Sequence, residues 1–145
     1  MVCKITDFGF STIIDKRKKS LSIGSPMYMA PEVISRMYDS KADIWALGVI
    51  AYILLTGKSP FEGKDNDAMF VQIRYGIIDK ECLSHYTKEG KYVKDFIIKT
   101  LNRNPNARHC AAELLQHKWF KKLVINHEIP EEELVDTGLN IYTFK

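Results

Sequence analysis

A run of apolar residues from Ile44 to Leu55 most constrains how this chain can fold. The run contains no charged residue and is much shorter than the roughly 20 residues that a membrane-spanning helix needs. Ser40 and Asp43 precede it with the spacing of an N-terminal capping box, and Gly57 follows it as a stop signal. The pattern predicts a helix that is apolar on every face and therefore buried on all sides, as the hydrophobic axis of one domain.

The remaining pattern predicts further helices around that axis and a short β-hairpin at the N-terminus. Residues 2–6 alternate apolar and polar side chains and residues 11–14 offer a return strand, which is typical of a hairpin. Residues 15–26 have no periodicity and indicate a long surface loop. Other helices are expected over residues 68–75, from about residue 91 to residue 101, and over residues 110–117. The expected fold class is mainly α, a helical bundle around one buried helix.

The composition of the chain indicates one globular domain and argues against some classes of partner and compartment. A chain of 145 residues with 46% hydrophobic residues can form one globular domain with a sizeable core. The net charge of +3, from 21 Lys and Arg against 18 Asp and Glu, is too small to indicate nucleic acid or a membrane as a partner. The 3 cysteines are odd in number and lack Cys-x-x-Cys spacing, which favours a reduced, cytoplasmic compartment over a disulfide framework.

Several short motifs follow one another along the chain. They are Asp7-Phe8-Gly9, Gly24-Ser25-Pro26, Ala30-Pro31-Glu32, the stretch from Asp43 to Gly48, Pro60-Phe61, Arg108, and the stretch from His117 to Phe120. In order and spacing, over residues 2–123, they resemble the C-terminal lobe of eukaryotic protein kinases. Within the calcium/calmodulin-dependent group, residues 52–57 and 101–120 are most similar to calcium-dependent protein kinases, whereas residues 24–34 are also similar to the autophagy-initiating kinases. The resemblance implies transfer of the ATP γ-phosphate to protein Ser or Thr hydroxyls.

The motif Asp7-Phe8-Gly9 would carry the cofactor chemistry that this resemblance implies. Asp7 would hold Mg²⁺ between the phosphates of ATP, which requires a hard carboxylate oxygen. Thr6 would face the adenine pocket, Phe8 would pack beneath the turn, and Gly9 would give the turn its backbone freedom. The alternatives are a solvated turn aspartate for Asp7 and a strand residue with a bonded hydroxyl for Thr6.

Hydroxyl residues occupy the activation segment that joins the first motifs. Ser25 would bond the catalytic aspartate and lysine of a serine/threonine kinase, and although Thr is commoner at this position, Ser preserves the hydrogen bond. Ser20 and Ser22 flank Leu21, which stands where the family usually carries a phosphoacceptor. They are therefore candidate phosphorylation sites, and two ordinary loop serines are the alternative.

The resemblance also assigns architectural residues. Glu32 would pair with Arg108 in a buried, bidentate ion pair that ties the activation segment to the helical subdomain. Asp43 would bond the backbone of the catalytic loop in a complete kinase. Within this chain, the role that Asp43 can satisfy is that of the capping-box acid.

The resemblance divides the chain into a partial kinase domain, residues 1–123, and a C-terminal extension, residues 124–145. No segment supplies the Gly-rich phosphate loop, the strand lysine or the catalytic loop, so the chain is expected to be inactive alone. ATP and Mg²⁺ are expected to bind in the intact kinase, and weakly or not at all to this chain by itself. A non-catalytic kinase-like binding or scaffold module is the alternative. The expected partners are a protein substrate, a regulatory domain or the missing N-lobe, and a second copy bound through exposed apolar surface.

Overall fold

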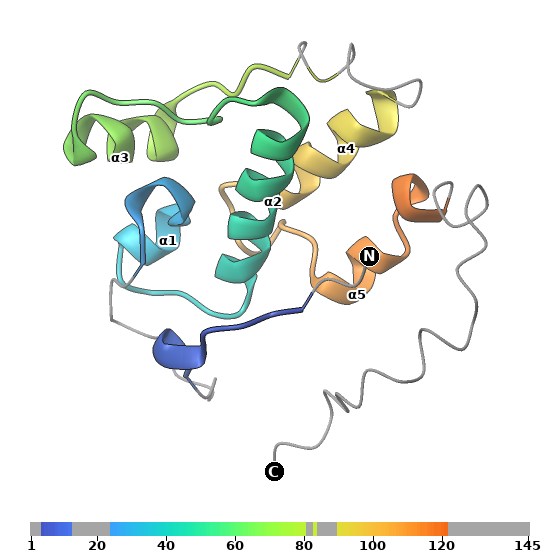
Figure 1. Cartoon of the computed structure of the whole chain (residues 1–145), viewed down its shortest axis with the longest axis horizontal. Helices are drawn as coiled ribbons and strands as arrows, with labels where there is room; N and C mark the ends of the chain where they lie inside the picture. Colours follow the sequence, from blue (N-terminus) through green and yellow to red (C-terminus); the bar gives the residue numbers. More distant parts are fainter. Residues whose placement is uncertain (1–3, 13–23, 81–82, 84–89, 122–145) are drawn as a thin grey trace.

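The computed structural model describes residues 4–12, 24–80, 83 and 90–121, in which the regular elements are helices (Figure 1). In chain order they are the 3-10 helices η1 (Phe8–Phe10) and η2 (Pro26–Tyr28) and the α-helices α1 (Pro31–Ile34), α2 (Lys41–Thr56), α3 (Asn66–Tyr75), α4 (Gly90–Thr100) and α5 (Ala111–Leu115). The predicted mainly α class is confirmed, and the helices expected from sequence correspond to α2 to α5. In the described ranges, no helix combines the length and the apolar character needed to cross a bilayer. The extension proposed for residues 124–145 lies outside them.

The predicted N-terminal β-hairpin is not confirmed. Residues 4–12 contain no strand, and the turn after Asp7 is the 3-10 helix η1. Every residue from Lys4 to Thr12 is exposed. A strand needs a neighbour that pairs with its backbone and a core that covers its apolar face, and these residues have neither in the described part of the chain. The other residues of the expected hairpin, 2–3 and 13–14, lie outside that part.

The N-terminus of α2 differs from the predicted capping box. Ser40 has helical backbone angles, φ −58° and ψ −18°, and its side chain makes no capping hydrogen bond. Asp39 takes that role, because its Oδ1 accepts a hydrogen bond from the Lys41 N–H at 2.9 Å and its carbonyl accepts one from the Ala42 N–H at 3.1 Å. The Asp43 carboxylate is therefore not used as a cap and is left for another role.

The prediction that α2 is buried on all sides is wrong. Its buried residues are Trp45, Gly48, Val49 and Tyr52. Leu47, Ile50 and Leu54, in contrast, are 44%, 45% and 81% exposed. Their spacing places them along one side of the helix, which is called the bare face of α2 below. An apolar sequence shows that a helix needs cover on every side, but the described residues cover only part of this one.

Close packing of α2 against α4 forms the centre of the core (Figure 1). A Cβ atom added at Gly48 would lie 2.5 Å from Thr100 Oγ1 and 2.8 Å from Leu101 Cδ2. Thr100 is fully buried, and its hydroxyl donates a hydrogen bond to the Phe96 carbonyl at 3.0 Å. Because Thr100 is held in this way, the missing side chain of Gly48 determines how closely the two helices approach.

Aromatic packing attaches the residues after α5 to the same core. The Phe96 ring lies edge-on to the rings of Trp119 and Phe120, with centroid distances of 5.1 and 5.3 Å. His117 Nε2 lies 2.9 Å from Asp95 Oδ2, which links this closing segment to α4 by a polar contact as well. The core on this side is therefore completed by residues of the chain itself.

We expect Gly48→Ala to destabilise the chain by about 1 to 3 kcal/mol, because the added methyl group overpacks a contact that cannot relax. The higher helix propensity of Ala would act in the opposite direction, so the sign of the change is informative. Urea denaturation followed by circular dichroism measures it. Leu54→Ala on the bare face is the control and should change the unfolding free energy by less than about 0.5 kcal/mol. Equal stability of Gly48→Ala and the wild type would contradict the tight contact.

Candidate functional site

A cavity of about 440 Å³ brings together residues that are far apart in the sequence. Its lining comes from segments within residues 7–12, 24–33 and 38–46. Asp7, Ser25 and Asp43 all line it. The structure therefore places the predicted magnesium ligand, the predicted hydroxyl of the activation segment and the α2 carboxylate around one space.

Asp7 adopts an unusual backbone conformation at the edge of this cavity. Its φ of 62° and ψ of 78° lie in the left-handed region, which residues other than glycine rarely occupy. The Asp7 Oδ1 accepts a hydrogen bond from the Gly9 N–H at 3.2 Å, which caps η1. Such conformations occur preferentially at functional turns, where the surrounding structure has to maintain them.

Two expectations about the neighbours of Asp7 are wrong. Phe8 is 66% exposed and does not pack beneath the turn, because no described segment covers it. The positive φ falls on Asp7 and not on Gly9, so Gly9 is not needed there for backbone freedom; a Cβ atom at Gly9 would instead approach Asp7 Oδ1 to 3.2 Å. Thr6 is exposed and does not line the cavity, so its adenine-facing role stays a prediction.

Ser25 precedes η2 and leaves its hydroxyl available. Its carbonyl accepts a hydrogen bond from the Tyr28 N–H at 3.0 Å, whereas its side chain makes no capping hydrogen bond. Gly24 provides the φ of 112° that brings the chain into this turn, an angle that side chains disfavour. The candidate phosphorylation sites Ser20 and Ser22 lie outside the described residues.

Asp43 reaches the cavity from the first turn of α2. Its carboxylate has no hydrogen-bond partner among the described residues, and desolvation by partial burial raises the pKa of Asp43 above its ordinary value. Neither the missing partner nor the raised pKa of Asp43 stabilises this chain. A carboxylate that lines a cavity and has no described partner is a candidate for a functional contact.

The described residues do not form a complete metal site. Across them, no group of three or more His, Cys, Asp and Glu side chains is placed to hold a metal ion. Mg²⁺ prefers about six oxygen ligands in octahedral geometry. Asp7 can supply one of these oxygens, so the residues present fit a single ligand of a shared magnesium site.

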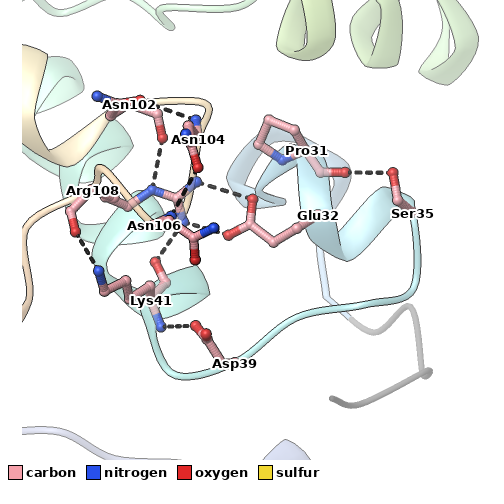
Figure 2. A network of polar contacts seen from close by, with 9 residues as sticks. All are labelled: Pro31, Glu32, Ser35, Asp39, Lys41, Asn102, Asn104, Asn106 and Arg108. Carbon is pink, nitrogen blue, oxygen red and sulfur yellow. Dashed lines mark hydrogen bonds and ion pairs between the residues drawn. The ribbon is translucent and has the colours of Figure 1, made fainter.

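A buried ion pair joins α1 to the loop after α4 (Figure 2). Arg108 Nη2 donates to Glu32 Oε2 at 3.0 Å and Nη1 donates to Glu32 Oε1, which makes the pair bidentate. The same guanidinium donates from Nε to the Asn102 carbonyl at 2.9 Å and from Nη1 to the Lys41 carbonyl at 2.7 Å. In return, Lys41 Nζ donates to the Arg108 carbonyl at 2.7 Å. One side chain thus fixes α1, the start of α2 and the loop before α5.

Sequence reasoning missed the residues that support this pair. Lys41 has no pattern that signals its bond to a carbonyl in a distant loop. Trp45 lies under the guanidinium, with Arg108 Cζ 5.1 Å from the indole ring, and its other neighbour is Phe61, whose ring stacks on it at 5.4 Å. Trp45 is visible as a motif residue, but its partners become clear only when the chain is folded.

The model of the protein kinase domain family matches residues 1–120. The chain therefore belongs to the protein kinase family. Its relatives include calcium-dependent protein kinase 5 of Plasmodium falciparum (isolate 3D7), 36% identical over 92% of this chain, and calcium-dependent protein kinase 29 of Arabidopsis thaliana, 43% identical over 81% of it. The sequence is thus similar to calcium-dependent protein kinases, as its motifs predict. It spans 24% and 22% of the lengths of these two relatives.

We expect Arg108→Leu to lower the unfolding free energy by about 3 to 5 kcal/mol, because it leaves the Glu32 carboxylate buried and unpaired. Urea denaturation measures the change. Lys99→Ala is the control, since it removes a partly exposed ion pair with Asp95 and should cost less than about 1 kcal/mol. A loss for Arg108→Leu no larger than that of the control would contradict the coupling role given to the pair.

We expect Asp43→Asn to raise the stability of the isolated chain slightly at neutral pH. The folded state raises the pKa of Asp43, so its ionised form is destabilising above the folded pKa, and this effect disappears as pH falls through that value toward the ordinary aspartate pKa of about 3.9. Denaturation midpoints of wild type and variant should therefore differ at pH 7 and converge in acid.

Asp67→Asn is the matched control for Asp43→Asn, because both carboxylates lie in the first turn of a helix, where a negative charge is favourable, but only Asp43 lines the cavity. It should give a small change of the opposite sign. An Asp43→Asn variant that is less stable than wild type at neutral pH would show that the favourable charge at the start of α2 outweighs the desolvation of the carboxylate, which would contradict the prediction.

Proposed function

We propose that this chain forms the substrate-facing part of a serine/threonine protein kinase, which transfers the ATP γ-phosphate to Ser or Thr hydroxyls of a protein substrate. The observation that carries the proposal is the shared cavity, which Asp7, Ser25 and Asp43 line from three separate segments. The pair between Glu32 and Arg108 supports it, because it holds the end of the activation segment next to that cavity.

Each of these residues has a role in the proposed enzyme. Asp7 would be one ligand of Mg²⁺, which together with bound ATP neutralises charge on the transferred phosphoryl group. The Ser25 hydroxyl would bond catalytic side chains of the complete kinase, and the Asp43 carboxylate would accept backbone N–H groups of the catalytic loop. Thr6, Phe8 and Gly9 would contribute to nucleotide binding once further segments cover them. Ser20 and Ser22 remain proposed phosphorylation sites, and a cytoplasmic location remains proposed from the cysteine pattern.

The bare face of α2 supports the view that more polypeptide covers this chain in the working protein. Leu47, Ile50 and Leu54 form a row of exposed apolar side chains on the central helix, and such surfaces usually mark an interface. The same row favours the second candidate function, a non-catalytic kinase-like module that binds a regulatory domain or a second copy. In either case residues 1–123 are the proposed kinase-like unit and residues 124–145 the proposed extension.

A phosphotransfer assay separates these functions. The isolated chain should show no transfer above background, because its 145 residues contain no catalytic loop to supply the general base. A longer protein that includes the upstream reading frame should phosphorylate a Ser or Thr peptide with ATP and Mg²⁺. In that protein Asp7→Ala should lower kcat roughly 100-fold or more, whereas Ser25→Thr should retain activity and Ser25→Ala should reduce it.

Other outcomes would count against the proposal. Turnover by the isolated chain would contradict its predicted inactivity. A stop codon directly upstream would favour the binding module, and a partner whose binding is lost in Leu54→Lys but kept in the exposed control Val71→Lys would support that module directly.

A further inference from the structure

The loop between α4 and α5 carries two arginines that reach different helices. Arg108 binds Glu32 of α1, as described above. Arg103 reaches the C-terminal end of α3, where Nε donates to the Ile73 carbonyl at 2.8 Å and Nη2 donates to the carbonyls of Gln72, at 3.3 Å, and Gly76. Residues 101–108, called the two-arginine loop here, therefore hold α1 and α3 from one place.

The contacts of Arg103 match what the end of α3 lacks. The last carbonyls of a helix have no partners within the helix, and they carry the negative end of its dipole. A guanidinium satisfies both needs, because it donates several hydrogen bonds and brings a positive charge. Arg103 forms no ion pair with a carboxylate in the described part of the chain, and its burial lowers the pKa of the guanidinium. The hydrogen bonds from Arg103 to the α3 carbonyls are thus what mainly replaces the water lost by its guanidinium.

The Arg103 bonds add a polar connection to the apolar attachment of α3. Ile73 is the one fully buried residue of α3, and Met69 and Phe70 are partly buried against the core. The N-terminal end is capped locally by Asp65, whose Oδ1 accepts a hydrogen bond from the Ala68 N–H at 2.8 Å. That cap stabilises the helix but does not connect it to another element. Arg103 provides a connection at the opposite end.

Helix α3 in turn packs against η2 and α1, and Figure 1 shows it beside α1. The segment η2 directly follows Ser25, and α1 contains Glu32. Arg103, α3 and the Ser25–Met29 segment therefore form a continuous chain of contacts from the two-arginine loop to the cavity.

We propose that Arg103 is a positioning residue for the segment Ser25–Met29, and that it acts by holding α3 against η2 and α1. The importance of this segment for substrate binding rests on the proposed kinase function, but the mechanical link between Arg103 and the segment does not. Arg108 holds the segment through α1, and Arg103 holds it through α3. The two-arginine loop thus supports the substrate-facing segment from two sides.

Hydrogen exchange measured by mass spectrometry on the 145-residue chain tests the link. In Arg103→Ala, amides of α3 and of residues 28–34 should exchange roughly tenfold faster or more, since hydrogen bonds from a charged donor are worth that factor. Amides of α2 and α4 should exchange as in wild type. Arg103→Lys should give intermediate rates, because an ammonium can still donate to some of the carbonyls.

Arg74→Ala is the matched control, because Arg74 is an exposed arginine in the last turn of α3 and leaves the Arg103 bonds in place. It should leave residues 28–34 unchanged. Faster exchange confined to α3 in Arg103→Ala would overturn the link to the Ser25–Met29 segment. Equal acceleration of every element, or no acceleration, would overturn it as well. Should Arg103→Ala fail to fold, the same comparison is decided by Arg103→Lys.

Steady-state kinetics on the longer kinase that includes the upstream reading frame give a second readout. Arg103→Ala should raise KM for the peptide substrate at least about tenfold and leave KM for ATP nearly unchanged, because Asp7 is not in the chain of contacts. An unchanged peptide KM would overturn the proposal. Absence of activity in the wild type would instead count against the proposed kinase function, so the two failures are distinguishable.

Discussion

The buried guanidinium of Arg108 is the interaction on which the arrangement of the other elements depends. A charge removed from water is costly unless its donors all find acceptors. Here the acceptors are Glu32, the Asn102 carbonyl and the Lys41 carbonyl, which come from α1, the loop after α4 and the start of α2. Movement of any one of these segments would leave a buried donor or carboxylate unpaired. The pair therefore couples three parts of the chain that apolar packing alone would hold less specifically.

The geometry of this pair is more important for α1 than its apolar contacts. The helix has four residues, and its buried members are Glu32 and Val33. A bidentate pair fixes the direction of approach as well as the distance, so it orients the short helix and the η2 segment before it. This arrangement has an energetic cost at Trp45, because its Nε1 is buried without a hydrogen-bond partner among the described residues. The Trp45 ring stacks on Phe61 and covers the Arg108 guanidinium. The structure thus leaves the Trp45 N–H without a partner while the pair between Glu32 and Arg108 fixes the position of the activation segment.

The apolar run predicted the central helix, and the resemblance of the motifs to protein kinases implied the pair between Glu32 and Arg108. They did not predict which faces would be covered. Phe8 and the bare face of α2 are exposed, although their apolar side chains look the same in the sequence as buried ones. An apolar side chain predicts burial, but it does not identify the segment that buries it. The cap of α2 was missed for a different reason: Asp39 and Ser40 are both good caps, and only backbone angles decide between them.

The side of the molecule around α4 and the side around the cavity differ in how completely this chain covers their apolar residues. Around α4 the chain closes its own core, with Val93, Phe96 and Ile97 at most 1% exposed. Around the cavity it leaves apolar side chains such as Phe10 uncovered, and partial desolvation raises the pKa of Asp43, whose carboxylate has no described partner, which slightly opposes folding of the isolated chain. Residues that oppose folding where they stand are best explained by a contact outside the fold. The two-arginine loop begins directly after α4 and binds α3 and α1, which lie beside the Ser25–Met29 segment. The well-packed core around α4 therefore holds the segments that line the cavity in place.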